Sequence, residues 1–283
     1  MAVVRSLKPA IGSLVRNPVI IAVAAVIGLL QLPQLPVPIT SPLLATAVSV
    51  RVSGLLLCVL HFYQGGIIGM ADDARTGTTN VGVLIDTRKS NYVSLLLSSA
   101  VVVAIAIAFG IIVAISAVVG GAGLVAGGDQ LSPGFLAVSP AILAVVALSG
   151  LGGYLVVMVC IQFYAHEIVL NDAAVADGFT GSASLVRENL LSAIGDSLLM
   201  FVGGGRIGGL SGAASILLSP QPPLQSMLPA LSLPATVGVG LVSIRATALL
   251  GAFYATYSVT FYRDIADSSG SGCEPAASDT LWG

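Results

Sequence analysis

The chain has 283 residues, of which 56% are hydrophobic and only 8% are charged, and its formal net charge is −2. A soluble domain carries about 25% charged residues, because water must solvate its surface. This composition excludes a soluble globular protein and predicts a chain surrounded mostly by lipid. The small net charge, without a clustered basic face, also excludes a nucleic-acid-binding protein.

Residues 2–16 are predicted to form an amphipathic helix on the membrane surface. Arg5, Lys8 and Arg16 fall on one helical stripe. The adjoining stripe is apolar and consists of Val4, Leu7, Ile11 and Val15. A helix of this kind lies between the lipid headgroups and the acyl chains. The apolar run that follows has no small-residue cleavage site, so we expect an uncleaved first span and not a signal peptide.

Six apolar stretches are predicted to cross the membrane as helices. The spans are residues 18–32, 42–70, 92–118, 140–170, 189–218 and 234–262. About 20 apolar residues cross a bilayer core as a helix. An open strand would leave its backbone unpaired in lipid, so even the β-branched third stretch is predicted to be helical. The predicted fold is all-α and polytopic, with six helices in three hairpins and short interfacial helices on the cytoplasmic face.

The distribution of positive charge predicts the orientation. Eight Lys and Arg residues lie outside the spans, all in alternate connections: Arg5, Lys8, Arg16, Arg75, Arg88, Lys89, Arg187 and Arg263. The connections near 34–41, 120–140 and 219–234 contain none. Because positive charge stays on the cytoplasmic side, both termini are predicted to lie inside the plasma membrane.

These patterns divide the chain into three predicted parts. Residues 1–17 form a cytoplasmic amphipathic segment, 18–264 the six-span membrane domain, and 265–283 an acidic, disordered cytoplasmic tail. An aromatic doublet recurs at Phe62-Tyr63 and Phe163-Tyr164. This recurrence indicates an internal repeat of hairpins, although aromatic residues gather at membrane interfaces in any case.

Three short motifs resemble those of a known group. They are Arg16-Asn17-Pro18, Ser184-Leu185-Val186-Arg187-Glu188-Asn189 and Phe261-Tyr262-Arg263-Asp264. With them the chain resembles the membrane domain found beside some glycerophosphodiester phosphodiesterases, and its stand-alone archaeal relatives. The resemblance covers the chain up to residue 264 and implies a multi-span helical domain without the soluble phosphodiesterase part. Only two lysines beside abundant Asp, Ala, Val and Gly also indicate a salt-adapted, halophilic source.

Arg51, Arg206 and Arg245 lie inside predicted spans, about 14–18 Å from the outer ends at 1.5 Å per residue. An isolated arginine near the bilayer centre costs at least about 2.5–3.5 kcal/mol. If the three side chains converge, they form a candidate anion-binding site for phosphate or a lipid headgroup. The alternative is that each arginine is stabilised separately, either by snorkelling to the headgroups or by hydrogen bonds to backbone carbonyls.

His61 and Glu167 are candidate polar or proton-handling sites near the cytoplasmic ends of spans two and four. Together with His166 they could approach a metal-binding set, but their spacing does not require one, so no metal or other cofactor is predicted. The glycine-rich run 203–209 lacks the ending of a phosphate-binding loop. It instead predicts a helix-packing face or a broken helix.

No nucleophile–base arrangement is recognisable, so the chain is not predicted to be an enzyme. The leading interpretation is an integral membrane protein that acts as a helper or scaffold in the cell envelope. Its partners would be the lipid bilayer and a cytoplasmic or membrane protein. The alternative is a transporter or channel for an anionic solute or lipid headgroup that uses the arginines within the spans.

Overall fold

The computed structural model of the chain describes residues 2–31, 42–125, 140–218 and 233–270. These residues contain helices and no strand, which confirms the all-α prediction. The helices are α1 (Ala2–Arg16), α2 (Pro18–Gln31), α3 (Pro42–Thr76), α4 (Val81–Val125), α5 (Pro140–Cys160), α6 (Tyr164–Leu170), α7 (Val175–Glu188), α8 (Leu190–Leu218) and α9 (Leu233–Ser268). The acidic segment 271–283 lies outside the described residues, as do most of the predicted outer connections.

Three described helical segments are long and apolar enough to cross a membrane. They are Asn91–Ile115, Val145–Leu170 and Val237–Ser268. The bent pair formed by α1 and α2 makes a fourth if it counts as one span, and the apolar segment Leu190–Gly205 of α8 is shorter. The protein is therefore helical and membrane-embedded.

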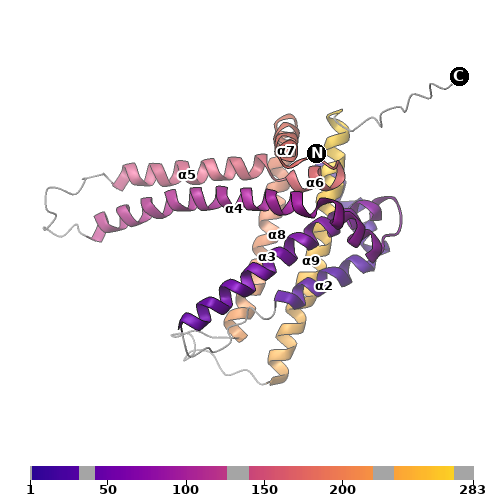
Figure 1. Ribbon diagram of the computed structural model, residues 1–283, viewed down its shortest axis with the longest axis horizontal. Coiled ribbons are helices and arrows are strands. Elements are labelled where there is room, and N and C mark those ends of the chain that lie inside the picture. The colour runs from indigo at the N-terminus through magenta and orange to yellow at the C-terminus, as the bar shows by residue number, and fades with distance from the viewer. Residues whose placement is uncertain (1, 32–41, 126–139, 219–232, 271–283) are drawn as a thin grey trace.

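Helices α4 and α5 lie side by side and form an arm that leaves the other helices (Figure 1). The ring centroids of Phe109 and Tyr154 lie 5.7 Å apart within this arm. Large apolar side chains such as Leu97, Ile107 and Leu148 are more than half exposed. Because apolar surface on this scale is stable in lipid and not in water, the arm's surroundings are acyl chains.

The fourth predicted span, residues 140–170, is not one helix. The helix stops at Cys160 and resumes at Tyr164. Ser182 of α7 is fully buried at this break, where its hydroxyl donates to the Cys160 carbonyl (2.9 Å) and accepts from the Phe163 N–H (3.0 Å). This one hydroxyl stabilises the break, because it satisfies two of the backbone groups that the interruption frees.

Three asparagines tie the start of one helical segment to the end of another. Asn17 accepts from the Thr79 N–H (2.9 Å) and donates to the Gly77 carbonyl (3.2 Å), just beyond α3. Asn91 donates to Asp172 Oδ1 (3.3 Å), just beyond α6. Asn189 donates to Ser269 Oγ (2.6 Å), just beyond α9. Asn17 and Asn189 precede α2 and α8, whereas Asn91 lies inside α4, so the internal repeat stays a prediction.

Glycines bring α3 close to α4. A Cβ atom on Gly66 would lie 2.8 Å from Leu84 Cγ and 2.9 Å from the Leu84 carbonyl oxygen. A Cβ atom on Gly69 would lie 2.6 Å from Thr87. Such small residues allow membrane helices to approach closely.

The glycine run of α8 does not break the helix, and its first glycine packs against α9. Helix α8 continues through it to Leu218. A Cβ on Gly204 or Gly205 would meet no described atom within 4 Å, whereas Gly203 lies directly against the ring and hydroxyl of Tyr254. The close contact between α8 and α9 is therefore made by the first glycine of the run.

Candidate functional site

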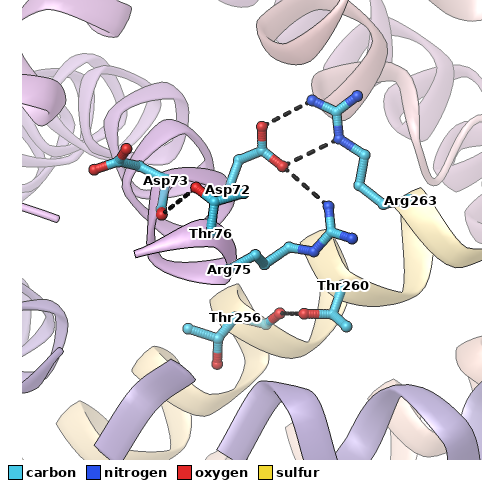
Figure 2. Close-up of polar contacts among 7 residues, drawn as sticks. All are labelled: Asp72, Asp73, Arg75, Thr76, Thr256, Thr260 and Arg263. Atoms are coloured by element: carbon cyan, nitrogen blue, oxygen red, sulfur yellow. Dashed lines mark hydrogen bonds and ion pairs between the residues drawn. The ribbon is translucent and has the colours of Figure 1, made fainter. Parts of the chain in front are cut away.

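The ends of α3 and α9 are joined by a bidentate ion pair. Arg263 Nε donates to Asp72 Oδ1 (3.1 Å) and Nη2 donates to Oδ2 (2.8 Å) (Figure 2). Arg75 Nη1, one turn away on α3, also donates to Asp72 Oδ1 (3.3 Å). Two guanidinium groups thus share one carboxylate, and the fork geometry fixes the position of α9 against α3. Arg263 and Asp72 keep 29% and 28% of their side-chain surface exposed, so the pair borders water.

A second polar connection joins α6 to α9 through the loop after α6. Asn171 Nδ2 donates to Glu167 Oε2 (2.7 Å) and to the Tyr262 hydroxyl (2.8 Å). Tyr262 is 1% exposed, so its hydroxyl depends on this contact. Glu167, the predicted proton-handling residue, is therefore held in a structural network.

His166 is packed inside an aromatic cluster and is 7% exposed. Its ring stacks on Tyr262, with centroids 5.3 Å apart, and meets Phe163 edge-on at 5.9 Å. His166 Nε2 lies 3.3 Å from Ser258 Oγ, and the Ser258 hydroxyl donates to the Ala255 carbonyl (3.1 Å). We infer that Nε2 carries the proton, because the Ser258 hydrogen is already used. Nδ1 is then a bare acceptor without a hydrogen-bond partner among the described residues.

The sequence grouped His166 with His61 and Glu167, whereas the structure packs His166 among aromatic rings. His166 and Glu167 are adjacent in sequence but point in directions about 100° apart on α6. One enters the aromatic cluster, while the other lines a cavity. No sequence signal distinguishes them, because the direction of each side chain depends on how α6 packs against α9.

A cavity of about 340 Å³ opens between α6, α7 and α9. Its charged lining residues are Glu167, Glu188, Asp267 and Arg263. Because Arg263 is already paired with Asp72, the three carboxylates give this cavity a negative character. Among the described residues, no three His, Cys, Asp or Glu side chains are grouped in a way that could hold a metal ion.

The three arginines predicted to bind an anion lie on three helices. Arg51 in α3 and Arg245 in α9 have exposed side chains, and no described residue forms an ion pair with either. Arg206 lies in α8, but its side chain is outside the described part of the chain, as is that of His61 in α3. A shared anion site therefore stays a prediction.

Asp196, a residue to which the sequence drew little attention, is buried between α8 and α9. It is 3% exposed and interacts with Tyr257, which is fully buried. Asp196 Oδ1 has no hydrogen-bond partner among the described residues. The structure turns Asp196 toward Tyr257 of α9.

The chain belongs to the family described as Domain of unknown function (DUF7847), whose model matches residues 1–265. No curated protein and no solved structure matches it. The family description names no reaction, ligand or partner. The resemblance to the membrane domain beside glycerophosphodiester phosphodiesterases, with its archaeal relatives, therefore stays a prediction.

Proposed function

We propose that this chain is a six-span protein of the plasma membrane, with both termini in the cytoplasm, and that it acts as a non-catalytic scaffold. The topology is supported by where the basic helix ends meet. Ser6 of α1 donates to Asp264 of α9 (3.2 Å), and Arg263 pairs with Asp72 of α3. These contacts bring the basic N-terminal helix to the same end of the molecule as the basic ends of α3 and α9, as the positive-inside rule requires.

The observation that carries the scaffold proposal is the use of the polar side chains at this end. Asp72 binds two arginines, Asn171 joins Glu167 to Tyr262, and Asn17, Asn91 and Asn189 tie helix ends together. An enzyme needs a nucleophile or base directed at a substrate position. Here the candidate groups hold segments that are distant in sequence, and the result is a rigid end to the helices.

Helix α7 offers the surface on which a cytoplasmic partner protein would dock. Apart from Ala176, its exposed side chains are polar: Asp177, Thr180, Ser184, Arg187 and Glu188. Its opposite side is anchored, since Ser182 bridges the break between α5 and α6. Because the buried side of α7 is held in place, its exposed side keeps one geometry to which a partner protein can bind.

A photo-crosslinking side chain at Thr180, in intact membranes, tests this surface. The scaffold proposal expects discrete protein adducts at Thr180. The control position is Leu191 on α8, whose side chain is 88% exposed and should give lipid adducts. Lipid adducts alone at Thr180 would contradict the proposal.

Cysteine labelling tests the topology independently. In a chain without its native cysteines, Asp177→Cys should react only with reagent added to the cytoplasmic side. Gln130→Cys should react only from the outside. The reverse pattern would overturn the layout of six spans.

A second candidate function, transport of an anion, is favoured by the exposed side chain of Arg245 within α9, which has no ion pair in the described part of the chain. Purified protein in proteoliposomes separates the two functions. A scaffold produces no flux of phosphate or chloride above protein-free vesicles. A transporter produces flux that Arg245→Gln reduces.

A further inference from the structure

Helix α1 lies across the start of α2 at 83°, so it runs transverse to the first apolar helix. One side of α1 packs against the protein, where Ser6, Ala10 and Ser13 are at most 2% exposed. These small residues let the helix lie close to α9, to which the Ser6 hydroxyl donates. The packed side is therefore not the apolar stripe that the sequence indicated.

That apolar stripe faces away from the protein. Val4 is 68% exposed, Ile11 51% and Val15 76%. Their spacings of seven and four residues place them on one side of the helix, beside the packed side. Only Leu7 of the predicted stripe is partly buried. An apolar strip beside a transverse helix matches acyl chains just below the headgroups.

The basic residues occupy the remaining side of α1. Arg5, Lys8 and Arg16 all have exposed side chains. At about 100° per residue they follow directly after the apolar strip around the helix. Gly12 lies among them with open space around it, and Arg16 Nε donates to the Gly12 carbonyl (3.3 Å). No described acidic residue forms an ion pair with these three cations.

We propose that α1 is a binding site for anionic lipid headgroups of the cytoplasmic leaflet. The apolar strip would enter the acyl region, and the basic strip beside it would then lie at the depth of the phosphates. Arginine forks bind phosphate oxygens in pairs, and basic residues near an anionic surface are attracted to it. The three exposed apolar side chains favour a bilayer lipid over a soluble phosphate. The inference rests on the proposed topology, because it requires α1 on the cytoplasmic side.

Two hydrogen-bonded connections link α1 to the ends of α3 and α9, where Asp72 pairs with Arg263. Ser6 links α1 to Asp264, which follows Arg263 in sequence. Asn17, at the end of α1, holds the loop after α3 through Gly77 and Thr79. A lipid that immobilises α1 therefore stabilises the ends of both helices that the Asp72–Arg263 pair joins.

The test uses the full chain in nanodiscs with equal amounts of phosphatidylglycerol and phosphatidylcholine. Native mass spectrometry measures the ratio of the two lipids that stay bound. We expect phosphatidylglycerol to be enriched, and each of Arg5→Gln, Lys8→Gln and Arg16→Gln to lower the enrichment about fivefold. The control Arg187→Gln removes an exposed charge from α7 and should leave the ratio unchanged.

Three results would overturn the lipid site. They are an unchanged ratio in a variant that carries all three substitutions, an equal loss in Arg187→Gln, and displacement of phosphatidylglycerol by millimolar inorganic phosphate, which would indicate a soluble-anion site. An environment-sensitive dye on Val15→Cys should also report an apolar surrounding, and a water-like signal would contradict the proposal. Labelling of Asp177→Cys distinguishes a failure of the lipid site from a failure of the proposed topology. A cytoplasmic Asp177 with unchanged lipid ratios rejects only the lipid site, whereas an external Asp177 rejects the topology beneath it.

Discussion

The three-residue cluster of Asp72, Arg75 and Arg263 predicts unequal effects for substitutions that each remove one charge. Arg263→Gln breaks two hydrogen bonds, but Asp72 keeps Arg75 on Oδ1. Asp72→Asn instead leaves two guanidinium groups beside each other without a carboxylate. Hydrogen bonds to charged groups contribute about 1.5–3 kcal/mol, and exposed ion pairs about 0–1 kcal/mol. Since these side chains are 28–29% exposed, we expect about 1–2 kcal/mol for Arg263→Gln and about 2–3 kcal/mol for Asp72→Asn.

The free energy of unfolding can be measured by titration with a denaturing detergent in mixed micelles, and the double variant completes a mutant cycle. We expect a coupling of about 1–2 kcal/mol between Asp72 and Arg263, because they touch directly. Arg75→Gln is the control and should cost least, since it loses one contact at 3.3 Å within its own helix. A larger loss in Arg263→Gln than in Asp72→Asn, or strict additivity, would refute this account of the cluster.

Three further predictions concern contacts between the helices. In chemical denaturation, Ser182→Ala should lower the free energy of unfolding by about 1–3 kcal/mol, because it leaves the Cys160 carbonyl and the Phe163 N–H unpaired. The control Ser184→Ala, on the exposed side of α7, should change the free energy of unfolding by less than about 0.5 kcal/mol. Gly66→Ala should lower the free energy of unfolding by about 1–3 kcal/mol, because the added methyl group meets the backbone of α4. The control Gly54→Ala, in open space on the same helix, should leave the melting temperature unchanged or raise it slightly in a thermal unfolding scan. Asn17→Ala should lower the melting temperature more than Asn91→Ala, because Asn17 makes three hydrogen bonds and is 2% exposed, whereas Asn91 donates one to Asp172. Equal melting temperatures for the two variants would contradict this ranking.

The sequence predicted helices correctly where a long apolar run has clear ends. The predicted second span begins at residue 42, as α3 does, because a proline opens the apolar run there. The fifth predicted span, 189–218, corresponds to α8 at Leu190–Leu218. Helix α9 continues four residues past the predicted end of the membrane domain at 264, since Ile265 is 1% exposed and packs into the core.

The features that could not be predicted from the sequence depend on contacts between residues far apart in the chain. Residues 161–163 contain no glycine or proline, so nothing local marks the break after Cys160. The break is stabilised by Ser182, 19 residues beyond Phe163. The pairing of Asp72 with Arg263 spans 191 residues and follows from the crossing of α3 and α9. Periodicity describes one helix at a time, so it predicts neither contact.

The sequence directed attention to the arginines within the spans, whereas the structure directs it to one end of the helices. In lipid, a helix satisfies its own backbone and needs few polar side chains. The polar contacts between distant helices are instead made by side chains near the helix ends. Asn17, Asp72 and Asn171 are all of this kind. With α1 attached to the same end, any headgroup or partner protein that binds there meets groups already coupled to α3, α6 and α9. Substitutions at that end should therefore impair a scaffold, whereas Arg245→Gln within α9 tests a transporter.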